Sequence, residues 1–381
     1  MIRMNRSFGP FCRVLLLLLA AALFPAGAEA HAAASSAGRA EDTAAQEIAE
    51  EEPDVKRIVL GHVGDSYEWH IATAGGREWS LPLPVIVHSP SSGWHCFSAK
   101  RLRGGAEYEG LRIAADGDHA GKIVERQADG SDLRPLDLSI TKTVAGLLLN
   151  SALVVALVLG AARRYRGRKP DAAAPRGVVG LFETLVESLV DDLIEPCVGP
   201  SYRRFAPYLL TVFCFIFLNN LMGLIPFFPG GANVTGNIAV ALVLAVATFL
   251  VVNLSGSRHY WKDIFWPDVP TWLKVPVPII PLIELVGVFT KPFALMIRLF
   301  ANMLAGHAVI LSLTCVVFVT VKMGAAVNAS MTAFSVLFSI FMNCLELLVA
   351  FLQAYVFTML SAVFIGLAQE RGGEADAGAE K

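Results

Sequence analysis

Two long apolar segments, residues 281–321 and 328–367, dominate the C-terminal half of the chain, and a short polar turn joins them. A perpendicular helix crosses the hydrocarbon of a bilayer in about 20 residues. Both segments are much longer than that. We therefore expect them to form a long helical hairpin that is strongly tilted in the membrane.

Three shorter apolar segments precede the hairpin, at residues 143–162, 208–228 and 236–254. Each has the length that spans a bilayer of about 30 Å. A basic cluster at 163–169 follows the first segment, and basic residues flank the next two, which predicts that these ends are cytoplasmic. The pattern predicts five membrane helices, with residues 371–381 as a cytoplasmic tail.

Two segments between the spans have a different pattern. Residues 178–194 predict an amphipathic helix whose polar side is acidic, which favours a protein neighbour over the membrane surface. Residues 267–281 are rich in proline, which stops helix formation. We expect both segments on the cytoplasmic side.

The N-terminal third of the chain predicts export. Residues 1–30 contain arginines, then a short apolar run, then Ala-Glu-Ala, the layout of a signal peptide; an uncleaved first span is the alternative. Residues 31–54 are rich in Ala, Ser and Glu and predict a disordered linker. Residues 55–140 contain short runs of aromatic and β-branched residues, which predict a small β-rich extracytoplasmic extension.

Composition supports the membrane class. Hydrophobic residues make up 55% of the chain and charged residues 17%, against about 25% charged residues in soluble domains. The net charge of -2 gives no basic face for nucleic acid. The histidines of the extension lack metal-site spacing, so no metal is expected. The predicted fold is an all-α polytopic membrane protein with a small β-rich exported extension.

The hairpin carries few ionisable groups. Arg298 and His307 lie on the first arm, and Glu346 lies on the second. Such groups are costly in hydrocarbon and normally face a protein interior or a water-filled cavity. In an antiparallel hairpin, residues at equal depth have position numbers with a constant sum, which places Arg298 opposite Gln353 and His307 opposite Glu346.

Helical spacing groups the polar residues further. On the first arm, one stripe contains Glu284, Lys291, Arg298 and Asn302. His307 lies about half a circumference away from Arg298 and about 13 Å along the axis. On the second arm, another stripe contains Ser339, Glu346 and Gln353, with Asn343 beside it. Facing polar stripes at different depths predict two partial water paths.

These residues resemble those of a known family. The run from Glu284 to His307, which contains Arg-Leu-Phe-Ala-Asn-Met, and the distant Leu-Gln-Ala-Tyr around Gln353 are similar to subunit a of the F-type ATP synthases, the membrane stator beside the rotating c-ring. The resemblance covers roughly residues 141–370. His307 and Glu346 are exchanged relative to many bacterial members, as in mitochondrial members, and the exchange keeps an acid beside a base.

The resemblance implies proton conduction coupled to rotation, in a subunit that is not itself catalytic and needs no cofactor. Arg298 would favour the ionised rotor carboxylate and block a direct leak, while His307 with Glu346 would exchange protons in the outer path. The remaining implied path residues are Asn302, Asn343 and Gln353, with Glu284 at the inner exit. Implied partners are the c-ring, around Arg298, and the peripheral stalk subunit b, in the cell inner membrane.

Alternatives remain at the level of sequence. Arg298 and Glu346 would form an internal ion pair in a purely structural interpretation. Asn219 and Asn220 predict either a bond between helices or, by the resemblance, a place for Asn220 near the outer path. A secondary transporter of a small solute would show an internal repeat, and none is visible. The coupling ion, H⁺ or Na⁺, stays open.

Overall fold

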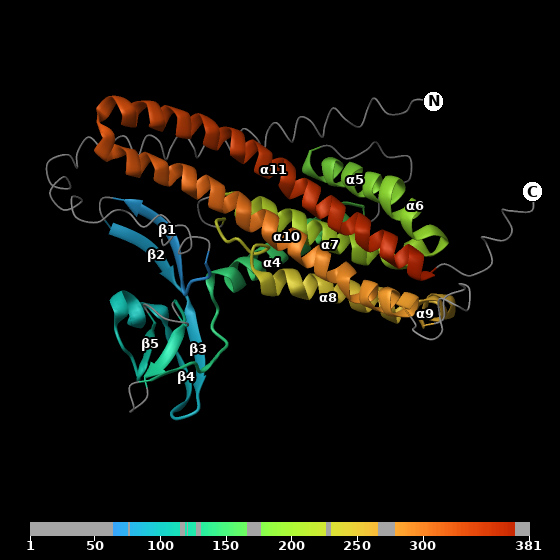
Figure 1. Cartoon of the computed structure of the whole chain (residues 1–381), viewed down its shortest axis with the longest axis horizontal. Coiled ribbons are helices and arrows are strands. Elements are labelled where there is room, and N and C mark those ends of the chain that lie inside the picture. Colours follow the sequence, from blue (N-terminus) through green and yellow to red (C-terminus); the bar gives the residue numbers. More distant parts are fainter. Residues whose placement is uncertain are drawn as a thin grey trace, which may run out of the picture.

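The computed structural model describes the middle and the C-terminal hairpin of the chain. The described residues are 64–74, 77–114, 119, 121–126, 131–165, 177–225, 230–265 and 279–369. Outside them lie the expected signal peptide (1–30), linker (31–54) and tail (371–381), most of the basic cluster 163–169 and most of the Pro-rich segment 267–281. A helical bundle carries a small β-rich part at one end (Figure 1).

The bundle consists of long apolar helices. They are α4 (Lys142–Tyr165), α7 (Tyr202–Gly223), α8 (Ile238–Leu254), α10 (Ile279–Thr320) and α11 (Ala325–Gln369), with the short α9 (Arg258–Phe265) after α8. Within the described residues, four helices are long and apolar enough to cross a membrane, or up to five if α8 and α9, bent by 102°, count as one span. The chain is a mostly helical, multi-pass membrane protein.

Helices α10 and α11 form the hairpin that the apolar pattern predicted. They have 42 and 45 residues, so each is more than about 60 Å long and must tilt to fit a bilayer of about 30 Å. The turn contains η5 (Val321–Met323) and Gly324, whose φ of 101° favours glycine. The Thr320 hydroxyl donates to Asn328 Oδ1 at 3.1 Å and joins the two arms beside the turn.

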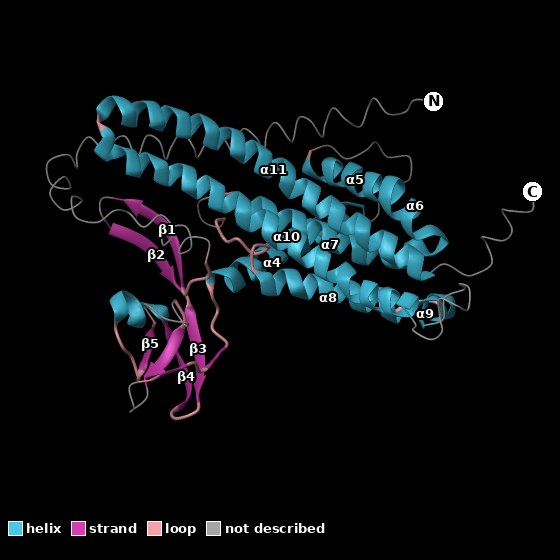
Figure 2. Cartoon of the chain, viewed as in Figure 1, coloured by secondary structure: helices cyan, strands magenta, loops and turns pink. Residues whose placement is uncertain are grey.

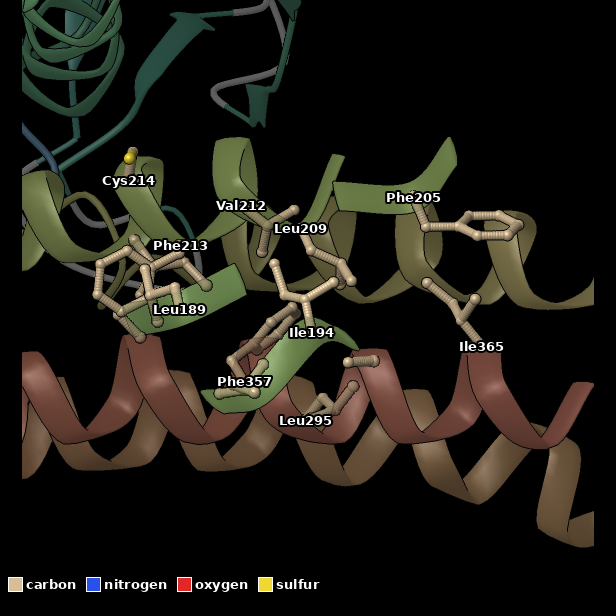
Figure 3. Close-up of a cluster of buried hydrophobic side chains, with 14 of the residues drawn as sticks. Leu189, Ile194, Phe205, Leu209, Val212, Phe213, Cys214, Leu295, Phe357 and Ile365 are labelled. Carbon is tan, nitrogen blue, oxygen red and sulfur yellow. The ribbon is translucent and has the colours of Figure 1, made fainter. Parts of the chain in front are cut away.

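The core of the bundle lies where α7 packs against α11 and α10. Side chains of these helices point toward one another, among them Leu209, Phe213, Leu295, Phe357 and Ile365 (Figure 3). The predicted amphipathic segment also enters this core. It consists of α5 (Val178–Leu189), a π-helical turn η2 (Val190–Ile194) and α6 (Glu195–Val198), and it buries Leu193 and Ile194. Its protein neighbours therefore include the chain's own α7 and α11.

Close approach of α6 to α11 depends on Gly366. A Cβ atom at this position would lie only 2.0 Å from the carbonyl oxygen of Cys197. Since a glycine is the only residue without this atom, Gly366 allows the amphipathic segment to pack directly on the backbone of α11.

The described residues of the β-rich part form three small antiparallel sheets (Figure 2). The strands are β1 (Glu68–Ala74), β2 (Arg77–Pro82), β3 (Pro84–Ser89), β4 (Gly93–Ser98), β5 (Leu111–Ile113), β6 (Ile123–Arg126), β7 (Asp132–Leu133) and β8 (Leu136–Asp137), with the 3-10 helix η1 (Ala99–Gly105) after β4. The sheet orders are β1-β2, β4-β3-β8 and β5-β6-β7. Val85, Val87 and Phe97 form a core with Leu111 and Ile123.

This part is packed onto one end of the bundle, at the connection between α7 and α8. Trp69 of β1 is buried against Ala232 and Val234, in the connection between α7 and α8. Its indole N–H donates to the carbonyl of Gly230 at 3.3 Å. The backbone N–H of Thr143, at the start of α4, donates to Asp65 Oδ1 at 3.0 Å. The β-rich part is thus fixed to the helices by contacts far apart in sequence.

Candidate functional site

His307 and Glu346 meet between α10 and α11, as the constant-sum argument predicted. His307 Nδ1 lies 2.7 Å from Glu346 Oε1, and Glu346 is only 6% exposed. Nδ1 and both carboxylate oxygens have no hydrogen-bond partner among the described residues. An imidazole nitrogen beside a carboxylate is an arrangement that can take up and release a proton.

The other side of the His307 ring touches α7. Its Nε2 lies 3.3 Å from the carbonyl oxygen of Gly223, which can only accept, so Nε2 carries a proton in this arrangement. Nδ1 is then the atom that gains or loses a proton beside Glu346. His307 therefore lies between the Gly223 carbonyl, which can only accept, and the carboxylate of Glu346.

Asn220 organises the polar groups beside this histidine. Its Nδ2 donates to the carbonyl of Ala350 on α11 at 3.3 Å, and its Oδ1 accepts from the Thr235 hydroxyl at 2.6 Å. Asn220 and Thr235 are fully buried. The neighbouring Asn219 instead accepts from Asn150 Nδ2 of α4 at 2.9 Å and joins two helices. The two asparagines therefore have different surroundings, and only Asn220 connects α7 to the hairpin.

Arg298 lies on an exposed face of α10. Among the residues that the structure describes, its guanidinium has no hydrogen-bond or ion-pair partner. Its exposed neighbours on α10 are mostly apolar: Ile297 is 43% exposed, and Ala294 and Ala301 are also exposed, with Asn302 as the polar neighbour. The internal ion pair with Glu346, which was the structural interpretation of the sequence, is absent from the described contacts. Gln353, expected opposite Arg298, is buried and makes no described bond to it.

The remaining predicted residues lie apart from one another. Asn302 and Glu284 are exposed on α10. Asn343 is half-buried and donates to the carbonyl of Ser339 at 2.9 Å on its own helix. The structure therefore brings together only His307 and Glu346 among the predicted residues.

A small cavity lies at the other end of the bundle, between α8, α9, α10 and α11. Its lining includes Asn253, Tyr260 and Lys291. The Tyr260 hydroxyl donates to Asn253 Oδ1 at 3.3 Å. Lys291 lies seven residues before Arg298, on the same stripe of α10. The cavity is otherwise lined mainly by apolar side chains, and it is distinct from the His307 pair and nearer to the chain's C-terminal end.

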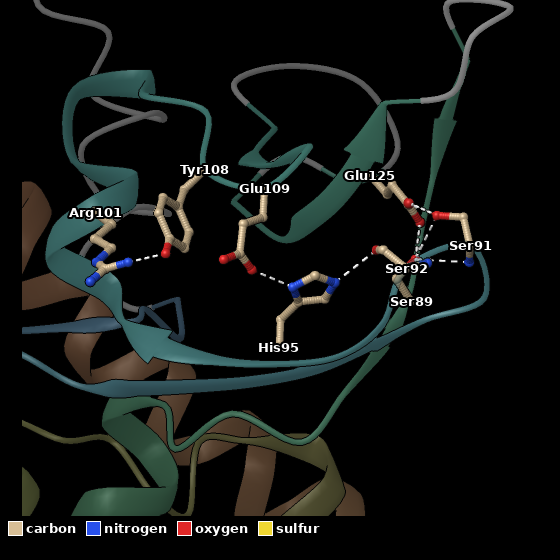
Figure 4. Close-up of polar contacts among 8 residues, drawn as sticks. All are labelled: Ser89, Ser91, Ser92, His95, Arg101, Tyr108, Glu109 and Glu125. Carbon is tan, nitrogen blue, oxygen red and sulfur yellow. Dashed lines mark hydrogen bonds and ion pairs between the residues drawn. The ribbon is translucent and has the colours of Figure 1, made fainter.

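The β-rich part has a polar network of its own (Figure 4). The Ser92 hydroxyl lies 2.7 Å from His95 Nε2, and His95 Nδ1 contacts Glu109, an order that resembles a hydrolytic triad. Such a triad needs free donors for an oxyanion. The N–H groups of Ser91 and Ser92 both donate to the Ser89 hydroxyl instead. Since Ser92 is on an exposed turn, we assign this network to the stability of the turn.

Carboxylates in this network have lowered pKa values. The hydrogen bond from His95 is the main cause of the lowered pKa of Glu109. Hydrogen bonds from the Ser89 and Ser91 hydroxyls lower the pKa of Glu125. Both side chains are therefore ionised near neutral pH.

Comparison with known proteins identifies the family. A family model described as ATP synthase A chain matches residues 147–366, more than half of the chain. The chain belongs to the ATP synthase A chain family. A second model, described as a domain of unknown function (DUF8433), matches residues 58–138. The polar pair and Arg298 all lie inside the segment that matches the ATP synthase A chain.

Individual relatives agree with this family. The chain is 45% identical over 245 residues to ATP synthase subunit a of Chlorobium phaeobacteroides (strain DSM 266), covering 63% of this chain and 68% of the relative. It is 46% identical over 241 residues to ATP synthase subunit a 2 of Chlorobaculum tepidum, covering 61% and 64%. It is 34% identical over 334 residues to ATP synthase subunit a of Anaeromyxobacter dehalogenans, covering 82% and 80%. This last match covers more of the chain than residues 147–381 contain, so it also includes part of the extension (residues 55–140).

Three residues of this site were not predicted. Gly306 gives the Glu346 carboxylate its room, because a Cβ there would lie 2.8 Å from Oε1. Thr235 and the Gly223 carbonyl complete the contacts of Asn220 and His307. Gly306 directly precedes His307 on a helix, and a glycine inside a helix is a usable signal of close packing. The other two contacts come from a loop and a backbone atom, which leave no pattern in the sequence.

Proposed function

We propose that the chain is the proton-conducting stator subunit in the membrane sector of an F-type ATP synthase. In this proposal the chain provides two half-channels that end near Arg298, and a carboxylate on a neighbouring c-ring picks up a proton from one and releases it into the other. The chain itself catalyses no bond change, and ATP is made elsewhere in the complex. Family membership and the surroundings of Arg298 support the proposal.

The single observation that carries it is the isolation of Arg298. A guanidinium keeps its charge at every relevant pH, and an unpaired charge in hydrocarbon is costly. Arg298 faces outward from an apolar part of α10 and has no partner in the described part of its own chain. A carboxylate on another subunit would neutralise it, and a ring of such subunits would present one repeatedly.

The His307 and Glu346 pair fits the outer half-channel. An imidazole exchanges protons near neutral pH, and the buried carboxylate oxygens of Glu346 lack a protein donor in the described residues, as groups that contact water do. Asn220 and Thr235 fix the α7 wall beside the pair. Gln353 and Asn343 would orient water further along α11.

The inner half-channel would use the other end of the α10 stripe. Glu284 lies near this end of the helix and would line the inner exit, whereas Asn302, on the His307 side of Arg298, would orient water with Gln353 and Asn343. Lys291, Asn253 and Tyr260 would contribute polar groups from the cavity near this end. A membrane potential of 100 mV supplies about 2.3 kcal/mol per elementary charge, so several protons must cross for each ATP.

The proposed assembly follows from the family. The c-ring would contact the chain around Arg298, and the peripheral stalk subunit b would hold it against rotation in the cell inner membrane. Residues 1–30 would direct the extension out of the cytoplasm, which leaves the C-terminal tail inside. A secondary transporter is less well supported, because such proteins use interrupted helices at their binding sites, whereas Arg298 and Glu346 lie on continuous helices.

The intact assembly tests the proposal. The chain should be purified from native membranes in a mild detergent, and the complex should be weighed by native mass spectrometry with its subunits counted. We expect many copies of a small two-helix protein for each copy of this chain. Recovery of the chain alone, or only with copies of itself, would favour a transporter.

A further inference from the structure

One face of the β4-β3-β8 sheet is apolar and exposed. In the sheet register His88 pairs with both Trp94 and Leu136, and Ile86 pairs with Cys96, so these side chains share one face. Leu138 joins them, since its N–H donates to the carbonyl of Ile86. The opposite face of the sheet carries Val85, Val87 and Phe97 and is buried in the core.

The exposed face has no formal charge. Its side chains are Pro84, Ile86, His88, Trp94, Cys96, Ser98, Leu136 and Leu138. Trp94 is 62% exposed, Leu136 is 58% exposed and Leu138 is 57% exposed. In an antiparallel sheet with one face in water, that face normally carries polar and charged side chains. The apolar face described here is therefore unusual for a solvated surface.

The sequence places this face close to the membrane boundary. The apolar part of α4 begins at Thr143, only five residues after Leu138. Five residues span at most about 18 Å even when extended. Leu138 and its neighbour Leu136 therefore lie near the level at which α4 enters the hydrocarbon.

The fold also directs this face toward the helices. β5 lies on one side of β3 and β4, whereas α4 and α8 extend away on the other side (Figure 1). Since the core of the β-rich part lies between β3 and β5, the apolar face points toward the side on which the helices run. There, α8 exposes Ile238 and Leu242 near its outer end, and α4 exposes Leu148.

We propose that this sheet face rests on the outer leaflet of the bilayer. Trp94 would lie at the headgroup level, where tryptophan is enriched, and Leu136 and Leu138 would reach the upper acyl chains. A lipid surface fits better than a protein because the face continues the lipid-facing sides of α4 and α8 and offers no charged residue for a protein partner. The extension is then held at Trp69 by the bundle and at Trp94 by lipid.

Nitroxide accessibility tests this surface in the assembled complex. A spin label is attached to a cysteine introduced as Trp94→Cys or Leu136→Cys, and the complex is reconstituted in lipid nanodiscs. Native cysteines that could compete are changed to serine: Cys12, Cys96, Cys197 and Cys344. Power saturation then compares collision with oxygen, which concentrates in lipid, and with a water-soluble nickel chelate.

The matched control is Ala106→Cys, an exposed position after η1 on the other side of the β-rich part. We expect the ratio of oxygen to nickel accessibility to be several-fold higher at positions 94 and 136 than at 106. Nickel accessibility equal to that at 106 would place the face in water, and low accessibility to both reagents would mean that a protein covers it. Either result overturns the proposal, and neither affects the role of Arg298.

Discussion

His307 Nδ1 and Glu346 Oε1 lie 2.7 Å apart on the two arms of the hairpin. The two residues are far apart in sequence and at the same depth in the fold. Because an imidazole and a carboxylate can exchange a proton when they lie this close, we expect the chemistry of the pair to depend on an acid next to a base, not on which helix carries which. This symmetry makes the pair testable by exchange.

The exchange of the two residues gives the first prediction. His307→Glu or Glu346→His alone creates a pair of like groups, and we expect passive proton flux through reconstituted membrane sectors to fall by about tenfold or more, toward the range of losses for a missing proton-transfer group. The double variant restores the pair and should retain more flux than either single variant. Equal loss in all three would show that the two side chains do not act together.

Gly306→Ala tests whether the space beside Gly306 is needed for proton flux independently of helix stability. The new Cβ would lie 2.8 Å from Glu346 Oε1 and push the carboxylate from its place beside His307. Alanine is also the better helix former by roughly 0.5–1 kcal/mol. We therefore expect lower proton flux with little loss in melting temperature. Gly160→Ala is the control, since a Cβ there meets nothing within 4 Å; an equal effect of both changes would refute the explanation.

Removing Trp69 should loosen the connection between α7 and α8. Trp69→Ala leaves a cavity against Ala232 and Val234 and should destabilise this contact by about 3–5 kcal/mol. Trp69→Phe loses mainly the hydrogen bond to Gly230, worth about 1 kcal/mol. Hydrogen exchange of residues 230–236 measures both. Trp79→Ala, at a side chain 65% exposed, should leave exchange unchanged, and a similar rise there would contradict the assignment.

The extension should lose stability in acid through Glu125. Its pKa is lowered in the folded state by the Ser89 and Ser91 hydroxyls. Its contribution is therefore complete above the ordinary glutamate value of about 4.3 and disappears as the pH falls through the folded value. Glu125→Gln should cost about 1 kcal/mol at pH 7, and this cost should shrink as the pH is lowered below the ordinary glutamate value. A cost that does not change with pH would point to lost packing instead.

The sequence predicted much of the hairpin and part of the site. Few polar residues interrupt the apolar segments, so their spacing alone determined which of them could meet, and His307 with Glu346 followed. The same argument placed Gln353 opposite Arg298, but equal depth is not contact: Arg298 lies on the outward side of α10, while Gln353 is buried. The spacing of residues in the sequence predicts their depth along the hairpin. Whether two residues at the same depth touch depends on how each helix is rotated about its axis.

Some contacts could not be predicted from the spacing of polar residues. Thr235 lies in the connection between α7 and α8, Trp69 packs on that connection from β1, and the Gly223 contact to His307 is made by a backbone carbonyl. Their positions depend on how the β-rich part packs on the helices. The π-helical turn at Val190–Ile194 was also missed, since it changes the face of the helix without changing the apolar pattern.

Arg298→Lys should show whether charge alone is sufficient. Lysine keeps a positive charge but can lose its proton when desolvated, and it lacks the planar group that binds a carboxylate with two hydrogen bonds. We expect ATP synthesis in membrane vesicles to be largely lost, with normal assembly of the complex. Synthesis near the wild-type rate would show that the guanidinium itself is not required.

The most direct measurement is ATP synthesis and passive proton leak in vesicles that contain Arg298→Ala, compared with wild type at equal amounts of assembled complex. We expect ATP synthesis to be abolished, because no fixed cation meets the rotor carboxylate, and the leak to rise, because nothing separates the two half-channels. Wild-type synthesis with an unchanged leak would contradict the account.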